Sequence, residues 1–260
     1  MEQQVKYSYY VEPFKLEDRP RRFLEALSAI LKHTNYGVVL DAYTRLSMKC
    51  SRCAITCPVY QVTNDPHDIP CYRSELFLKI YRRYFTFAGM MKARLYDYFT
   101  LTDDYIDKLA ESVYRCTACR RCTLECPLGM DHGIITHLAR WTLAEIGIAP
   151  KALVVATREQ LEGKTKNTSA IPVIALKDTC EFLEEELEEM FPGAGIKFPL
   201  DVEGAEYVFF PAVSDYLLEA ETLMGNAAVL HAVGASWTIG TGNFDGIDYG
   251  LFYSDTMWDR

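Results

Sequence analysis

The sequence has no run of roughly 18 or more uncharged apolar residues, the length that a membrane-spanning helix requires. Its opening residues, MEQQVKYSYYVE, also lack the apolar core of a secretory signal. Basic residues are outnumbered, since 27 Lys and Arg stand against 36 Asp and Glu, whereas a nucleic-acid-binding domain carries a basic patch. We therefore expect a cytoplasmic protein with no transmembrane segment of its own and no nucleic acid partner, either free or held at the inner face of the membrane by a partner subunit.

Structural disulfides are not expected either, although the chain contains nine cysteines. Thiols in the cytosol are kept reduced by the glutathione and thioredoxin pools. A hydrophobic content of 49% with 24% charged residues is typical of a folded chain with a core rather than of a disordered one. Metal binding is therefore the first hypothesis for the cysteines.

Apolar residues recur at helical spacing through most of the chain. Thr102 and Asp131 are suited to cap helices, because their side-chain oxygens can accept the free backbone N–H groups of a first turn. The polar stretch EGKTKNTS at residues 162–169 indicates an exposed boundary. We expect helices over residues 21–31, 74–99 with a break near Gly89, 102–113, 131–143, 151–161 and 178–190.

The pattern changes after residue 200. Residues 207–210 form a short apolar run suited to a buried strand, 214–233 follow an amphipathic helical pattern, and 236–239 predict a second strand. A strand, a helix and a strand in this order predict the beginning of an α/β domain.

The strongest signal for chemistry is the run of Cys116, Cys119, Cys122 and Cys126 followed by Pro127. This spacing, C-x2-C-x2-C-x3-C-P, is that of bacterial [4Fe–4S] ferredoxins. In such runs the first three thiolates surround one cluster, and the fourth cysteine ligates the other cluster of a two-cluster protein. The run therefore predicts a second cysteine site elsewhere in the chain.

That second site lies upstream, where Cys50, Cys53 and Cys57 before Pro58 repeat the last three cysteines of the run. Ser47 occupies the position of the first cysteine. An iron without a thiolate needs another ligand, and we favour Cys71 as the replacement, with Ser47 as the alternative.

The chain is thus predicted to bind two [4Fe–4S] clusters. Under the crossed rule of two-cluster ferredoxins the cysteines of the two runs are shared between the clusters, while an uncrossed arrangement keeps each run separate. The ninth cysteine, Cys180, follows the apolar face of its predicted helix, so we interpret it as buried packing. The crossed ligand sets are Cys50, Cys53, Cys71 and Cys126 for one cluster, and Cys57, Cys116, Cys119 and Cys122 for the other.

Two other metal hypotheses are weaker. Zinc also binds C-x2-C pairs, but three closely spaced cysteines with a fourth before proline exceed the two-pair pattern of a zinc site. The incomplete upstream run could instead hold a [3Fe–4S] cluster.

His67 and His132 lie close to the runs and could tune or ligate a cluster, yet a structural role is the simpler interpretation of each.

Two cysteine runs separated by about 60 mainly helical residues resemble the α-helical ferredoxin domain of heterodisulfide reductase C-type subunits and of succinate dehydrogenase iron–sulfur subunits. The segment EYVFFPAVSDYLLEAETLMGNAAVLHAVGASWTIG is similar to the start of the cysteine-rich CCG domain in heterodisulfide reductase D-type subunits and in the K-type subunit of the sulfite-reductase-associated membrane complex. In that family a C-x31–38-C-C-G repeat ligates a cluster at which disulfides are cleaved. Here Ala212, Phe244 and Asp245 stand at the cysteine positions, and only the glycine, Gly246, is kept.

The resemblance implies a fold that is mainly α, with an α-helical ferredoxin domain carrying two [4Fe–4S] clusters followed by the start of an α/β CCG-type domain. The boundaries we expect are a lead-in segment with a helix at 1–45, the ferredoxin domain at 46–150, a helical connector at 151–200 and the beginning of the CCG-like domain at 201–260. The first repeat is degenerate, so we identify no residue of this chain that converts a substrate.

The function implied is that of an electron-transfer iron–sulfur subunit in a heterodisulfide-reductase-like complex, relaying electrons between a donor subunit and a thiol/disulfide catalytic centre. The expected partners are other redox subunits: a membrane cytochrome b, a flavoprotein or a CCG-domain catalytic subunit. Two alternatives are the iron–sulfur subunit of a flavin-dependent 2-hydroxyacid or glycerol 3-phosphate dehydrogenase, and a fragment of a disulfide reductase whose catalytic cluster lies downstream. A zinc-stabilised interaction module is a third.

Overall fold

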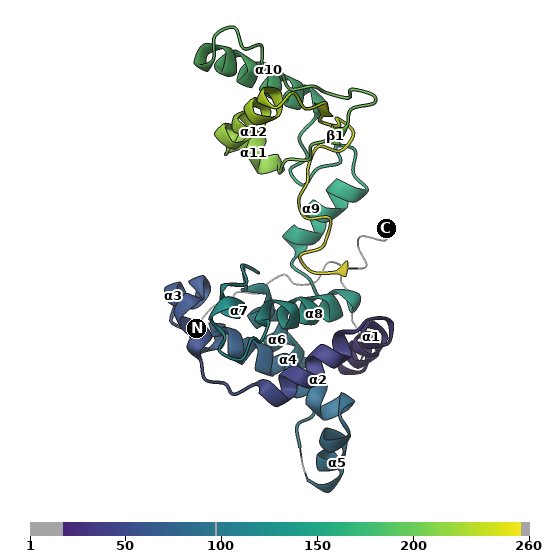
Figure 1. Cartoon of the computed structure of the whole chain (residues 1–260). Coiled ribbons are helices and arrows are strands. Elements are labelled where there is room, and N and C mark those ends of the chain that lie inside the picture. Colours follow the sequence, from purple (N-terminus) through teal and green to yellow (C-terminus); the bar gives the residue numbers. More distant parts are fainter. Residues whose placement is uncertain (1–17, 97, 256–260) are drawn as a thin grey trace, which may run out of the picture. The chain divides into compact units, whose positions relative to one another are not determined.

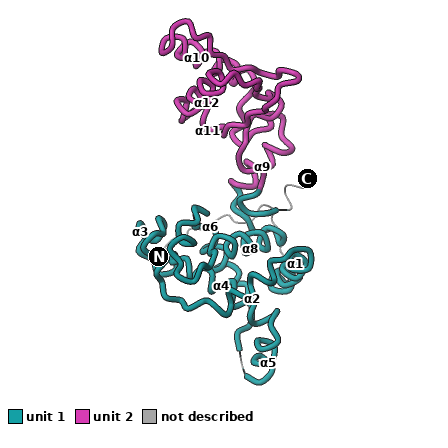
Figure 2. Tube along the Cα trace, in the orientation of Figure 1, with its two compact units in different colours: residues 1–151, 251–259 teal, residues 152–250, 260 magenta. Residues whose placement is uncertain are grey.

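A computed structural model describes residues 18–96 and 98–255 of the chain. The described residues divide into two compact units, shown in different colours in Figure 2. Unit 1 contains residues 18–151 and also residues 251–255, while unit 2 contains residues 152–250. The four-part division expected from the sequence stays a prediction, but the return of residues 251–255 to unit 1 was not anticipated.

Unit 1 is built of helices (Figure 1), which confirms the prediction of a mainly helical fold. In the described part of the chain, no helix is both long enough and apolar enough to cross a membrane. The elements of unit 1 are α1 (Arg19–His33), α2 (Tyr36–Leu46), the 3-10 turn η1 (Arg52–Thr56), α3 (Pro58–Thr63), the 3-10 turn η2 (Pro66–Asp68), α4 (Pro70–Phe85), α5 (Phe87–Leu95), α6 (Asp103–Tyr114), α7 (Arg121–Glu125) and α8 (His132–Glu145).

The two predicted capping residues begin α6 and α8. Thr102 Oγ1 accepts the backbone N–H of Tyr105 at 3.3 Å, and Asp131 Oδ1 accepts those of Gly133 and Ile134 at 2.9 and 3.2 Å. These bonds satisfy N–H groups that a first helical turn leaves free. Both predictions are confirmed, and the caps fix where the chain enters α6, which leads to Cys116, and α8, which follows Cys126.

The core of unit 1 forms around α8, which packs against α1, α4 and α6. The buried side of α8 carries Ile135, Leu138 and Leu143, and α6 contributes Ile106 and Leu109 at helical spacing. Burying such side chains contributes about 1.5–3 kcal/mol each relative to leaving them exposed. The helices that surround the cysteine runs therefore belong to one packed core.

The predicted helix over residues 74–99 is divided into α4 and α5 at Thr86. Thr86 has an extended backbone, and its Oγ1 accepts the N–H of Gly89 at 3.1 Å, so it caps the new helix. Gly89 packs directly on α4, because a Cβ built there would lie 1.7 Å from the carbonyl oxygen of Arg82. The predicted break is confirmed, and the glycine marks the close approach of the two helices.

Unit 2 combines helices with a short parallel sheet. Tyr207 pairs with Trp237 and Val208 with Thr238, and an isolated bridge joins Leu200 to Ile239. The elements are α9 (Lys151–Leu161), whose first residue is counted with unit 1, then α10 (Val173–Met190), β1 (Tyr207–Val208), α11 (Val213–Leu217), α12 (Ala220–Ala232) and β2 (Trp237–Thr238).

Two expectations for unit 2 are wrong. The helix predicted over residues 214–233 is interrupted, because the N–H groups of Leu218 and Glu219 both donate to the Ser214 carbonyl and close a tight turn between α11 and α12. The strand predicted as buried is exposed: Tyr207 and Val208 are 53% and 54% accessible. A strand is buried on both faces where helices cover the sheet on both sides, and the exposure of Tyr207 and Val208 shows that β1 is not covered in this way by the described residues.

Candidate functional site

The two cysteine runs adopt the same local structure. In each, a residue directly after a cysteine has a left-handed backbone, with φ of 59° at Ser51 and 56° at Arg120. A short helix follows, η1 or α7, and it ends where Cys57 N–H donates to Ala54 and where Cys126 N–H donates to Thr123, both at 3.3 Å. The two short helices pack against each other. The cysteines before and after each short helix are therefore presented in related positions.

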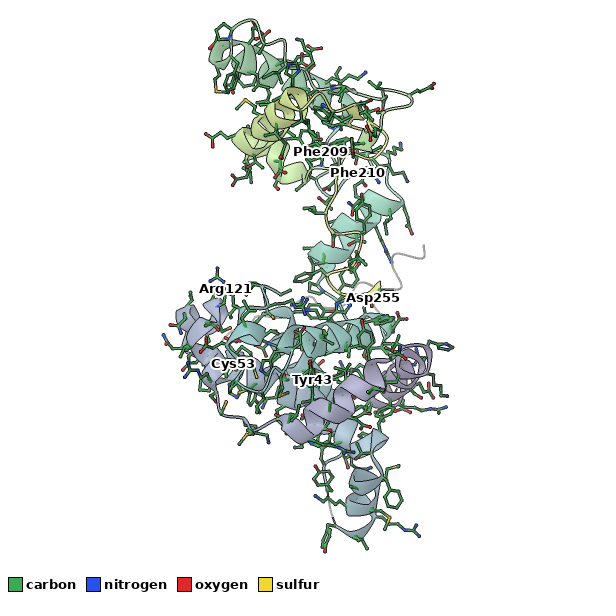
Figure 3. The ribbon with its side chains drawn as sticks, in the orientation of Figure 1. Tyr43, Cys53, Arg121, Phe209, Phe210 and Asp255 are labelled. Atoms are coloured by element: carbon green, nitrogen blue, oxygen red, sulfur yellow. The ribbon has the colours of Figure 1, made fainter. Side chains whose placement is uncertain are left out.

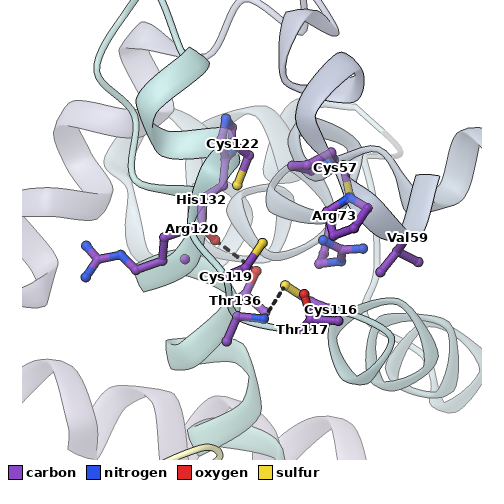
Figure 4. A pocket seen from close by; sticks show the side chains of 14 residues that line it. Cys57, Val59, Arg73, Cys116, Thr117, Cys119, Arg120, Cys122, His132 and Thr136 are labelled. Atoms are coloured by element: carbon purple, nitrogen blue, oxygen red, sulfur yellow. Dashed lines mark hydrogen bonds between the residues drawn. The ribbon is translucent and has the colours of Figure 1, made fainter. Parts of the chain in front are cut away.

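One cysteine-lined pocket, which we call the Cys116 pocket, is lined by four of the predicted ligands. Figure 4 shows their sulfur atoms facing a common space. Three of them belong to the downstream run and follow α6 or lie on α7, whereas the fourth ends η1 in the upstream run. The four cysteines are Cys57, Cys116, Cys119 and Cys122.

A second pocket, the Cys50 pocket, is lined by the other four predicted ligands. Cys50 precedes η1, Cys53 lies on it (Figure 3), and Cys71 lies in the first turn of α4. Cys126, from the downstream run, completes the set. Ser47, the alternative to Cys71, lines this pocket as well, so both candidates for the missing ligand stand at the predicted place.

The grouping of the cysteines thus exchanges one residue between the runs, as in the crossed arrangement expected from the sequence. In the described part of the chain, no three His, Cys, Asp or Glu side chains converge on a point where one metal ion could bind. A [4Fe–4S] cluster takes one thiolate on each iron, so its ligands line a cavity, which is the arrangement of both sets. The donor atoms and their placement fit that cofactor.

Several thiols have shifted pKa values because of their neighbours. A hydrogen bond between Cys53 and Cys71 raises the pKa of Cys53 and, together with the hydroxyl of Ser51, whose Oγ is 3.7 Å from Cys71 Sγ, lowers that of Cys71 to about 6. Burial, followed by the nearby Cys116 sulfur, raises the pKa of Cys122 to about 11. Thiols packed this closely do not all ionise together unless positive charge offsets them.

Two buried arginines supply positive charge next to the Cys116 pocket. Arg73, which lines the pocket, donates to the carbonyl oxygens of Ser112 at 2.7 Å and Asp68 at 3.2 Å. Arg140 donates to the carbonyl oxygens of Val113, Cys116 and Phe252. Burial lowers the pKa of Arg140 to about 10, so it stays charged at neutral pH.

Neither arginine forms an ion pair with a carboxylate in the described part of the chain. A buried charge is costly unless it is paired. Ionised thiols of the Cys116 pocket offer the opposite charge, because Cys122 lies within electrostatic reach of Arg73 and Cys116 within reach of Arg140. Sequence analysis missed both residues. The available signal was a cation followed by apolar residues on the same helical face, since Leu143 and Ala144 stand three and four positions after Arg140.

The remaining candidates are placed away from the sulfur atoms or packed in the core. His67 is exposed, and its Nδ1 lies 2.8 Å from Asp65 Oδ1. His132 is buried and lines both pockets, and burial lowers its pKa to about 4. Cys180 is buried in the core of unit 2, which confirms its predicted packing role, and burial raises the pKa of its thiol to about 12.

Two of the residues at the positions matched to the C-C-G repeat, Phe244 and Asp245, have side chains that pack or hydrogen-bond inside unit 2. Phe244 is fully buried with its ring edge against Tyr216, at a centroid distance of 5.7 Å. The buried carboxylate of Asp245 accepts the N–H and hydroxyl of Thr168 at 2.8 and 2.7 Å and the N–H of Val213 at 3.2 Å. Asp245 therefore has its hydrogen-bonding capacity satisfied inside unit 2.

The glycine of this repeat has a packing reason of its own. A Cβ at Gly246 would lie 2.3 Å from the carbonyl oxygen of Phe210 (Figure 3). Gly246 N–H also donates to the Pro211 carbonyl at 2.8 Å. The close approach of the two backbones requires glycine whether or not a cluster is bound nearby.

Comparison with known proteins supports iron–sulfur chemistry. Residues 48–130 match the family model of the 4Fe-4S dicluster domain. The Hdr-like menaquinol oxidoreductase iron-sulfur subunit 2 of Archaeoglobus fulgidus is 27% identical over 239 residues, and the Hdr-like menaquinol oxidoreductase iron-sulfur subunit of Archaeoglobus profundus is 24% identical over 258 residues. No solved structure matches the chain.

The two alignments cover 89% and 96% of this chain but 42% and 45% of the relatives. The chain therefore spans less than half the length of the curated relatives that it matches. The predicted [4Fe–4S] chemistry and the resemblance to heterodisulfide-reductase-like iron–sulfur subunits are confirmed.

Proposed function

We propose that this chain is an electron-transfer subunit of a heterodisulfide-reductase-like complex, relaying electrons between a donor subunit and a thiol/disulfide catalytic centre. The observation that carries the proposal is the grouping of the seven cysteines of the two runs, together with Cys71, around two neighbouring pockets. The dicluster match over residues 48–130 and the relatives named as iron–sulfur subunits support it.

Each pocket holds one [4Fe–4S] cluster in this proposal, and a bound cluster accepts and returns single electrons. Cys57, Cys116, Cys119 and Cys122 are the ligands of one cluster. Cys50, Cys53, Cys71 and Cys126 are those of the other. The exchange of Cys57 and Cys126 between the runs supports the crossed arrangement, in which two clusters lie close enough to exchange electrons with each other.

The rest of the chain provides the environment for these groups. Arg73 and Arg140 balance the charge of the thiolates from within the core, where their attraction is weakly screened by solvent. Arg140 also holds the carbonyl groups of Val113 and Cys116, and so fixes the end of α6 from which the downstream run begins. Both arginines therefore bind backbone and offset charge at the same time.

The donor and acceptor are proposed to be other subunits. The relatives are named as subunits of a menaquinol oxidoreductase, which favours a partner subunit that oxidises menaquinol as the donor. Bond-breaking chemistry is assigned to a partner or to a further domain, because Ala212, Phe244 and Asp245 offer no sulfur ligand at the repeat of unit 2.

The test is a reductive titration of anaerobically purified protein. We expect dithionite to deliver about two electrons per chain, one for each cluster, with bleaching of the visible colour that reverses when an oxidised quinone is added. A Cys116→Ser variant should take up fewer electrons, and a Cys180→Ala variant the same number as the unchanged protein. A colourless protein that binds zinc and takes up no electrons would overturn the proposal in favour of a zinc-stabilised module.

A further inference from the structure

His132 occupies a position shared by the two cysteine pockets. It is the first residue of α8, its side chain is 4% exposed, and it lines both the Cys116 pocket and the Cys50 pocket. Among the lining residues in the described part of the chain, it is the one common to both. The His132 side chain therefore borders both pockets while it remains buried.

The imidazole ring is held in one orientation. Ser74 Oγ on α4 lies 2.8 Å from His132 Nδ1, and both residues are buried. The Asp131 cap fixes the first turn of α8, and Thr136 Oγ1 donates to the His132 carbonyl at 2.9 Å. Contacts with α4 and with its own helix therefore hold the ring, which lies in the packed core at the border of both pockets.

The Ser74 contact also decides which nitrogen faces other partners. Within the described residues, the hydrogen bond to the ring is made at Nδ1, which leaves Nε2 available. In a neutral imidazole one nitrogen donates and the other accepts. The Ser74–His132 contact allows either direction of donation. In the tautomer in which the Ser74 hydroxyl donates to Nδ1, Nε2 carries the hydrogen, and the sulfurs of the cysteines that line the two pockets are the acceptors within its surroundings.

We propose that His132 donates a hydrogen bond from Nε2 to sulfur in the cluster sites and thereby raises the reduction potential of the cluster pair. This inference rests on the proposed function, since it requires that the pockets hold clusters. A reduced cluster carries one more negative charge than an oxidised one, so a hydrogen-bond donor stabilises the reduced form more. Hydrogen bonds to the sulfurs are among the factors that set cluster potentials.

The test is a redox titration of the iron-loaded protein followed by electron paramagnetic resonance. His132→Phe keeps a ring of similar bulk and removes the donor. We expect the reduction equilibrium of at least one cluster to become about tenfold less favourable, a fall of about 59 mV for a one-electron couple. His132→Gln, which restores an N–H donor, should show a smaller fall.

Two further variants separate this role from a structural one. Ser74→Ala removes the hydroxyl that holds the ring and should lower the potential less than His132→Phe, with the same iron content as the unchanged protein. His137→Phe is the matched control, because His137 lies on the same helix but its Nε2 contacts Asp255 Oδ1 at 2.7 Å. Its cluster potentials should not move.

Two outcomes would overturn the inference. If His132→Phe and Ser74→Ala both hold full iron with unchanged potentials, the ring does not act on the clusters. If His132→Phe loses iron while Ser74→Ala is unaffected, the ring is an iron ligand and not a hydrogen-bond donor. Failure of the unchanged protein to bind iron would instead refute the proposed function, so the two claims are separable.

Discussion

The ligand that replaces the missing first cysteine of the upstream run can be identified with one substitution. Cys71 is buried in the first turn of α4 and lines the Cys50 pocket. Cys71→Ser leaves a hydroxyl close to Ser51 Oγ, which is 3.7 Å from the sulfur in the unchanged protein. Because two oxygens this far apart do not form a hydrogen bond, the buried hydroxyl loses the contact that the larger sulfur made, and we expect a folding cost of about 1–3 kcal/mol without metal.

The main effect of Cys71→Ser should be on iron content, while the folded structure is largely kept. Two [4Fe–4S] clusters contain about eight irons, so loss of one cluster leaves about four, and conversion of that cluster to a three-iron form leaves about seven. Iron analysis with electron paramagnetic resonance of the reduced protein measures both outcomes. The signal of the cluster in the Cys116 pocket should persist.

Ser47→Ala is the matched control, because Ser47 lines the same pocket at the position of the missing cysteine. It should keep full iron. If Cys71→Ser keeps full iron and an unchanged spectrum, Cys71 is not a ligand. If Ser47→Ala loses iron while Cys71→Ser keeps it, the serine oxygen completes the cluster and our choice between the two residues is wrong.

Three further predictions concern other parts of the chain. Cys126→Ser should remove the cluster of the Cys50 pocket and spare the other; loss of the Cys116-pocket signal would instead indicate uncrossed ligation. Gly246→Ala should destabilise unit 2 by about 1–3 kcal/mol in chemical denaturation, because its Cβ would meet the Phe210 carbonyl at 2.3 Å, whereas Gly240→Ala, with its nearest atom at 3.8 Å, should cost less. Asp131→Ala should cost about 0.5–2 kcal/mol in the same assay through loss of the α8 cap, and an unchanged midpoint would show that the cap does not stabilise α8.

The cysteine runs could be predicted because cluster binding requires a fixed spacing of cysteines, and that spacing is visible within a short stretch of sequence. The caps at Thr102 and Asp131 were predictable for the same reason, since a helix start is a local event. The left-handed residues Ser51 and Arg120, which shape both runs, have no comparable signal in their side chains.

Features that depend on distant parts of the chain could not be predicted. Arg73 and Arg140 bind carbonyl groups of α6 and of residue 252, and a sequence does not state which carbonyls will meet a given guanidinium. The apolar pattern continues through Leu217 and Leu218 and predicted one helix there, but the structure has a break between α11 and α12. In each case tertiary contacts decided the structure, and the local pattern was consistent with more than one outcome.

The central claim is that this chain holds two [4Fe–4S] clusters, and metal analysis of anaerobically purified protein tests it most directly. We predict about eight irons and about eight acid-labile sulfides per chain, with no stoichiometric zinc. Fewer than about six irons per chain would contradict the claim of two complete [4Fe–4S] clusters, and zinc without sulfide would contradict iron–sulfur chemistry altogether.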